Sequence, residues 1–138
     1  MRATTFANNA MLDFLFGSNP SSPSGGWYVG LSTTNIDDNG GGVKEPLDAE
    51  YSRQQITSGS TNWELTSASA ITNRTKLNFA QSVYGWGIIQ EVFLATSSIE
   101  ANTGSYIWYH DDINPSIPIG TYTTLNINPG TIIVTHRE

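Results

Sequence analysis

The chain contains no cysteine and few charged residues. None of its 138 residues can form a disulfide or a thiolate metal site. Charged residues make up 13% of the sequence, well below the roughly 25% of an average globular domain. No apolar run approaches the ~18–20 residues that a membrane-spanning helix needs. Asn8, Asn9 and Asp13 interrupt the apolar N-terminal segment, so we predict no signal peptide and expect synthesis in a cytoplasm.

Basic side chains are also scarce. The six Lys and Arg residues face twelve Asp and Glu residues, which gives a net charge of −6. They are scattered along the chain and cannot form the basic stripe that neutralises nucleic-acid phosphates. We therefore expect no nucleic-acid partner and no membrane partner. Ser, Thr, Asn and Gly fill the surface instead, a composition common in extracellular and particle-bound β-proteins.

One segment, residues 5–16, has a clear helical period. Its apolar residues fall in two adjacent rows, Phe6, Ala10 and Phe14 beside Ala7, Met11 and Leu15. Thr4 or Thr5 can cap the start, and Gly17 stands where a glycine ends a helix. Residues 18–26, SNPSSPSGG, follow as a proline- and glycine-rich linker.

After the linker the sequence predicts β-structure throughout. Expected strands cover residues 27–33, 51–57, 71–79, 86–96, 106–109, 122–127 and 131–135. Residues 58–70 are expected to be irregular, 114–120 a loop, and 128–130 a hairpin turn. Residues 86–96 carry large apolar groups on both faces, which predicts a central strand. The fold class is mainly β: an antiparallel β-sandwich or jelly roll of seven to eight strands with one N-terminal helix.

We expect a single domain over residues 1–138, made of a helical arm (1–17), the linker (18–26) and a β-sandwich (27–138). The helix can pack on its own sandwich or dock on a neighbouring molecule, and the sequence leaves both arrangements open. A wide apolar face followed by a flexible tether suits an anchoring arm. The candidate partner interface consists of Phe6, Met11, Phe14, Leu15 and Phe16.

Two groups of polar residues suggest metal or catalytic chemistry. Asp37, Asp38 and Asn39, with Glu45 and Asp48 after them, resemble a calcium loop, but the spacing fits poorly. A turn in which Asp and Asn bind their own backbone is the favoured interpretation.

The second group is the sequence His110-Asp111-Asp112, which His136 could join. Turn chemistry at a strand end is the simpler interpretation. Glu64, Glu91 and Glu100 are candidate glycosidase carboxylates, but their spacing singles out no pair. No GxSxG motif is present. We therefore expect neither an enzyme nor a cofactor or metal site.

Four tryptophans raise the question of sugar binding, because exposed aromatic rings stack on sugar faces. Trp27, Trp86 and Trp108 lie in or beside apolar strand runs and are expected to fill the core. Trp63 lies in a polar stretch between Asn62 and Glu64, which makes it the candidate glycan contact.

Several motifs occur in a characteristic order. TFANNAMLDFLFG (5–17) precedes WYVGLSTT (27–34), an acidic glycine-rich loop that closes with Glu45-Pro46, and YSRQQIT (51–57). Asn62-Trp63, KLNF (76–79), the YGWG step (84–87) and FLAT (93–96) follow. This order resembles a family of small tailed-bacteriophage virion proteins, often labelled tail fibre or hypothetical structural proteins. The resemblance covers about residues 4–134 and departs from the family after Ala95, in residues 96–112.

The resemblance implies a structural virion component with no catalytic residues. The small polar β-sandwich favours a capsid decoration (cement) protein that binds the head surface and stabilises contacts between capsomers. Its expected partners are the major capsid protein or other virion proteins, and further copies of the chain in a homo-oligomer. The alternative is a tail-fibre or host-recognition module that binds a surface glycan. In both cases the expected location is the virion, assembled in the host cytoplasm.

Overall fold

The computed structural model describes residues 1–16, 26–66, 70–98 and 107–135. These residues form one helix, α1 (Thr5–Phe16), and ten strands. All strand pairs are antiparallel, so the predicted mainly β, antiparallel fold is confirmed. The strands outnumber the expected seven to eight because several are only two or three residues long. Gly17 and the 18–26 linker, except Gly26, lie outside the described residues.

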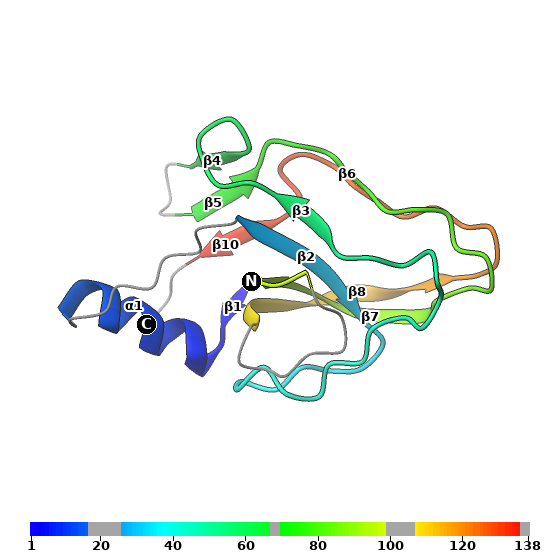
Figure 1. Cartoon of the computed structure of the whole chain (residues 1–138), viewed down its shortest axis with the longest axis horizontal. Coiled ribbons are helices and arrows are strands. Elements are labelled where there is room, and N and C mark those ends of the chain that lie inside the picture. Colours follow the sequence, from blue (N-terminus) through cyan, green and yellow to red (C-terminus); the bar gives the residue numbers. More distant parts are fainter. Residues whose placement is uncertain (17–25, 67–69, 99–106, 136–138) are drawn as a thin grey trace.

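The larger layer is a five-stranded sheet (Figure 1). Its order is β1 (Arg2–Ala3), β8 (Ile107–Ile119), β7 (Gly87–Ala95), β2 (Trp27–Ser32) and β3 (Gln54–Ile56). β7 is the central strand, as its two apolar faces predict. Phe93 on β7 lies opposite Gly30 on one side and His110 on the other. Phe93 and Leu94, which point to opposite faces, are both buried.

The second layer consists of two short sheets that continue one another. One contains β10 (Ile133–Thr135), β5 (Ala70–Asn73) and β4 (Trp63–Leu65), and the other contains β6 (Leu77–Asn78) and β9 (Asn126–Ile127). Asn73 bridges the break between them. Its Nδ2 donates to the Asn128 carbonyl at 3.1 Å, and its Oδ1 accepts from the Ile132 amide at 2.9 Å.

Three sequence predictions about connections are wrong. Residues 128–130 form a turn, but not a hairpin, because β9 pairs with β6 whereas β10 pairs with β5. Residues 58–70 contain β4, which pairs with β5. Residues 114–120 are no loop, since β8 runs on to Ile119. Pro115 and Pro118 are tolerated there because β1 flanks β8 only near Tyr109 and His110, which leaves the rest of β8 as an edge.

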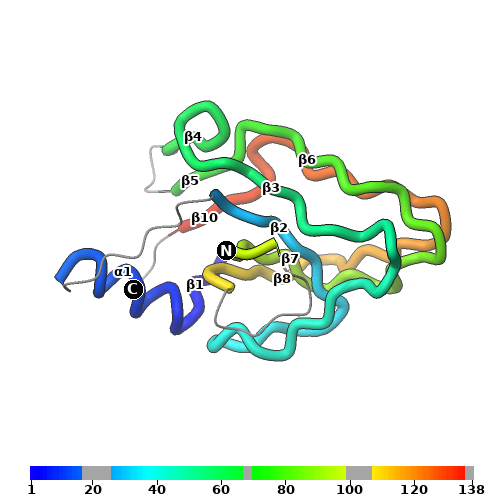
Figure 2. The backbone as a smooth tube through the Cα atoms, viewed as in Figure 1, coloured from blue at the N-terminus to red at the C-terminus, as the bar shows by residue number. Residues whose placement is uncertain are grey.

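The main core lies between the layers. Leu31, Ile89 and Leu94 of the larger sheet face Leu77 and Ile132 of the second layer. The opposite face of the larger sheet is covered by the segment after β2, which runs along β7 and β8 in Figure 2. Helix α1 lies at one end of the long axis, and the turns at residues 81–85 and 120–123 lie at the other (Figure 1). In the described ranges, no helix is long and apolar enough to cross a membrane.

Candidate functional site

Helix α1 begins on a fixed residue of the sheet. The Thr4 hydroxyl accepts a hydrogen bond from the Ala7 amide at 3.2 Å and donates one to the Ile107 carbonyl at 2.7 Å. Thr4 is therefore the N-cap and also ties the helix to β8. Ala7 and Ala10 are buried in the core. The first two turns of the helix thus belong to the sandwich.

The five residues of the predicted partner interface divide into two groups. Phe6 packs edge-on against Trp108 with ring centroids 5.3 Å apart. The Tyr109 hydroxyl donates to the Met11 sulfur at 3.6 Å. Phe6 and Met11 therefore contact the chain's own β8. The other three residues, Phe14, Leu15 and Phe16, lie in the last turn of α1.

The last turn of α1 leaves its apolar side chains in solvent. Phe14 is 57% exposed, Leu15 67% and Phe16 85%, and Leu12 beside them is 57% exposed. Isolated exposed apolar residues are ordinary, but several large ones close together in the sequence at one end of a small protein are typical of an interaction site. We call Leu12, Phe14, Leu15 and Phe16 the helix end.

A groove lies beside Trp63, the predicted glycan contact. It has a volume of about 430 Å³ and takes lining residues from both layers, with Trp27, Leu94 and Tyr109 facing Trp63 and Ile71. Trp63 is half-buried and packs on the core rather than standing free in solvent. Trp86 and Trp108 are buried, as predicted, whereas Trp27 is only half-buried.

The motifs that carry the family resemblance meet in a buried polar network. Arg53 Nε and Nη2 each donate to one Glu45 carboxylate oxygen at 2.9 Å. The Tyr51 hydroxyl donates to Glu45 at 2.8 Å and accepts from the Leu31 amide at 2.9 Å. Burial, first of all, and the Glu45 charge raise the pKa of Tyr51, so this hydroxyl stays protonated. The network fixes the segment after β2 to the sheet.

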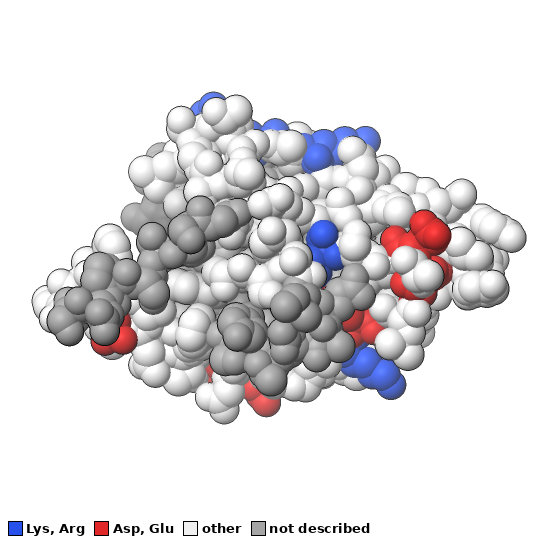
Figure 3. Space-filling model, viewed as in Figure 1, with Lys and Arg blue, Asp and Glu red and all other residues white. Residues whose placement is uncertain are grey.

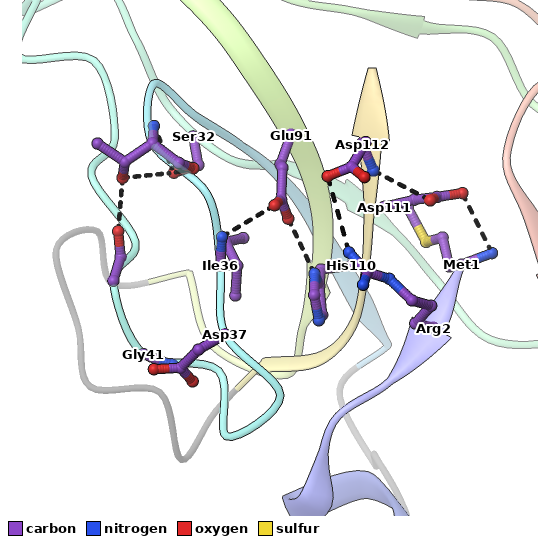
Figure 4. Close-up of polar contacts among 12 residues, drawn as sticks. Met1, Arg2, Ser32, Ile36, Asp37, Gly41, Glu91, His110, Asp111 and Asp112 are labelled. Atoms are coloured by element: carbon purple, nitrogen blue, oxygen red, sulfur yellow. Dashed lines mark hydrogen bonds and ion pairs between the residues drawn. The ribbon is translucent and has the colours of Figure 1, made fainter. Parts of the chain in front are cut away.

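His110 does not form a site with Asp111 and Asp112. Its Nδ1 lies 2.8 Å from Glu91 Oε2, and both side chains are buried (Figure 4). The other Glu91 oxygen accepts from the Ile36 amide at 2.9 Å. Asp111 and Asp112 instead pair with the Met1 amino group and Arg2, at 3.6 and 3.7 Å.

The sequence interpretation missed the Glu91–His110 pair, and it also placed Asp111 and Asp112 at a strand end, whereas they lie inside β8. The available signal was a lone carboxylate among the apolar residues of β7, because a buried charge needs a partner. Glu64 forms an exposed pair with Arg74 at 3.4 Å. Glu100 and His136 lie outside the described residues.

The acidic glycine-rich segment forms a turn, as predicted. Asp37 Oδ1 accepts from the amides of Asn39 and Gly41, both at 2.8 Å. Glu45 and Asp48, the later residues of the calcium-loop pattern, do not take part in this turn: Glu45 binds Arg53, and Asp48 binds the Val83 amide. Within the described residues, no three His, Asp or Glu side chains come together as a metal site would require.

Asp48 joins two turns at the end of the molecule opposite α1. Its Oδ2 accepts from the amides of Val83 and Tyr84 at 2.8 and 3.0 Å, and its Oδ1 accepts from the Glu50 amide at 3.0 Å. The hydrogen bond from the Glu50 amide, followed by that from Tyr84, holds the pKa of Asp48 below its ordinary value of 3.8. The turn after residue 46 and the turn at 81–85 are therefore fixed to each other.

The family described as podophage GP4 fiber I protein gp80 matches residues 2–135, nearly the whole chain. No curated protein matches this sequence. The match agrees with the resemblance that the motif order carries, and it extends through residues 96–112, where the sequence departs from the expected pattern. The chain belongs to the podophage GP4 fiber I protein gp80 family, a family of tailed-phage virion structural proteins.

Proposed function

We propose that the chain is a fibre subunit of a tailed-phage particle and that the helix end attaches it to neighbouring virion proteins. The observation that carries the proposal is the exposure of four apolar side chains, Leu12, Phe14, Leu15 and Phe16, within the last five residues of α1. Burying these side chains against a partner removes apolar surface from water, which is the main favourable term in most protein association. Further copies of this chain are also suitable partners.

The description of the family favours a fibre over the capsid decoration role that the sequence alone favours. The arrangement of the molecule supports the same choice. The helix end lies at one extreme of the long axis and the turns fixed by Asp48 lie at the other (Figure 1). A subunit held at one end projects its other end away from the particle, as a fibre does. A cement protein instead needs contacts on several sides to join capsomers.

We propose a structural rather than a catalytic role. The buried ionisable side chains support it, because each is used to hold the fold: Glu45 binds Arg53, and Glu91 binds His110. The His110 ring is closed off from solvent. The net charge of −6 agrees with protein partners rather than nucleic acid. Assembly into the virion in the host cytoplasm is part of the same proposal.

The test is the position of the chain in the virion. An antibody fragment against the purified chain, bound to phage particles, marks the subunit in a cryo-electron microscopy reconstruction. We expect extra density on fibres of the tail apparatus, in a copy number set by tail symmetry. Density on the faces or edges of the capsid would contradict the fibre proposal and support the decoration role. Particles that bind no fragment, in a preparation where a known tail protein is labelled, would contradict both.

A further inference from the structure

Two tyrosines and a leucine stand in solvent on adjoining turns at the end opposite α1. Tyr84 is 84% exposed, Tyr122 71% and Leu47 92%. The turns are in direct contact, since the Tyr122 amide donates to the Ser82 carbonyl at 2.9 Å and Asp48 binds the Tyr84 amide. We call Leu47, Tyr84 and Tyr122 the distal tip. Packing within the chain does not explain rings that are this exposed.

The distal tip has a fixed backbone. Ser82 is fully buried and connects the two tyrosine turns. Its hydroxyl donates to the Gly120 carbonyl at 2.5 Å and accepts from the Thr123 amide at 3.1 Å, and its own amide donates to the Thr123 carbonyl at 3.0 Å. A ligand that binds rings on a fixed backbone loses little free energy to ordering the protein.

Tyr122 adopts a backbone conformation that disfavours its side chain. Its φ is +53°, and among the described residues it is the only non-glycine residue with positive φ. A bulky residue in the left-handed region is strained, whereas glycine or asparagine is accommodated there. Fold stability alone would favour one of those two residues. A ring kept at this position, and exposed, points to a role in contact with another molecule.

The groups around the rings define the chemistry of the ligand. Gln81 and Thr121 adjoin Tyr122 with uncharged polar side chains, and the Gln81 amide group donates to the Tyr122 carbonyl at 3.0 Å. Glu50, whose backbone amide binds Asp48 as that of Tyr84 does, adds an exposed carboxylate. In Figure 3 the end of the molecule opposite α1, on the right, carries no charged atoms on the visible face. Acidic atoms lie next to it. Phosphate- or carboxylate-bearing ligands are repelled there. The C–H face of a sugar packs on an aromatic ring, and its hydroxyls bond to amides and carboxylates.

We propose that the distal tip binds an uncharged saccharide, with Tyr84 and Tyr122 as the rings on which it packs. That this saccharide belongs to a bacterial envelope rests on the proposed fibre function. The binding itself does not, because it is a property of the isolated chain.

The experiment uses the purified full chain and immobilised bacterial polysaccharides. One set of polymers consists of uncharged hexoses, and the other carries uronate or phosphate groups. Binding is measured by biolayer interferometry. We expect the parent chain to bind at least one uncharged polymer and none of the charged ones. Tyr84→Ala and Tyr122→Asn each weaken binding by about tenfold or more, whereas Tyr84→Phe, which keeps the ring, stays within about threefold of the parent.

The control variants separate the distal tip from the groove. Tyr122→Asn suits a positive φ, and denaturant unfolding verifies that each variant remains folded. Trp63→Leu alters the groove and should bind like the parent. A parent that binds only charged polymers, or none, overturns the proposal. Tyr84→Ala and Tyr122→Asn variants that bind like the parent overturn it too. Loss of polysaccharide binding in Trp63→Leu alone also overturns it, because that result places the saccharide in the groove. None of these results changes the location of the chain in the virion, which tests the fibre function separately.

Discussion

Gly30 on β2 lies directly beneath the ring of Phe93 on β7, so closely that a Cβ atom on residue 30 would stand 2.2 Å from Phe93 Cζ. The Arg53 guanidinium lies over the same ring, 5.0 Å from its centroid. The glycine of the WYVGLST strand therefore makes room for an aromatic ring between the sheet and the buried ion pair. Its role is steric, because its φ is not among the positive values.

Gly30→Ala should destabilise the protein by about 2–3 kcal/mol, because the added methyl group displaces a fully buried ring. Gly120→Ala is the matched control, since its Cβ would meet only the Thr123 hydroxyl oxygen at 3.9 Å. That control should stay within about 0.5 kcal/mol of the parent. Urea unfolding measures both. Equal stability of the two variants would show that the Phe93 ring moves aside freely.

Arg53→Met should cost about 3–5 kcal/mol, because it leaves the Glu45 carboxylate buried without its cation while preserving much of the side-chain volume. Arg53 and Glu45 side chains are 1% and 3% exposed. Arg74→Met likewise removes the cation of the Arg74–Glu64 pair, in which both side chains are about half exposed. It should cost less than about 1 kcal/mol. A similar loss in both variants, measured by urea unfolding, would contradict the account of the network.

Asp48→Asn should destabilise the protein at neutral pH and matter less in acid. The folded-state pKa of Asp48 lies below its ordinary value of 3.8, so the carboxylate contributes stability above that value. The contribution is lost as the pH falls through the folded-state pKa. The difference in unfolding free energy between parent and variant should therefore shrink below about pH 3.8. A difference that is constant, or that grows in acid, would contradict the hydrogen-bonding role.

Trp86→Ala should cost about 3–5 kcal/mol, because the ring is 4% exposed and packs edge-on against Tyr51 and Phe79. Tyr84→Ala, two residues earlier, removes a ring that is 84% exposed and should change stability by less than about 0.5 kcal/mol. Thermal unfolding with van't Hoff analysis compares them. If Trp86→Ala were as stable as Tyr84→Ala, the ring would not be a core element.

The sequence predicted those features that depend on local pattern. The 3.6-residue period and Thr4 located the helix, and two apolar faces located β7 at the centre of its sheet. The period could not show that the last turn of α1 would be exposed, because burial depends on tertiary contacts that the helical pattern does not contain. Proline suggested a loop at residues 114–120, although an edge strand tolerates proline as well.

The long-range contacts could not be predicted from one sequence. Glu91 meets His110 only because β7 and β8 pair in the observed register. The turns that carry Tyr84 and Tyr122 are in contact because the β6–β9 pairing continues through Ser82 to Thr123. Neither YGWG nor the sequence around Tyr122 signals that contact. The quoted motifs did reveal the family, and their residues Gly30, Glu45, Tyr51 and Arg53 prove to hold the fold together.

Deleting residues 1–17 is not a clean test of attachment, because the deletion removes β1 and the core residues Ala7 and Ala10. Substituting only exposed residues avoids this. A phage that carries Phe14→Ser, Leu15→Ser and Phe16→Ser together keeps the first two turns of α1 intact. Leu65→Ser, which changes a side chain 75% exposed on β4, is the control.

The number of copies of the chain per purified virion, measured by quantitative mass spectrometry against a known capsid protein, tests attachment through the helix end most directly. We expect the triple variant to fall to about one tenth of the parental number or less. The Leu65→Ser control should keep the parental number, and both variants should remain folded and soluble in the lysate. A triple variant present in virions at the parental number would contradict the account.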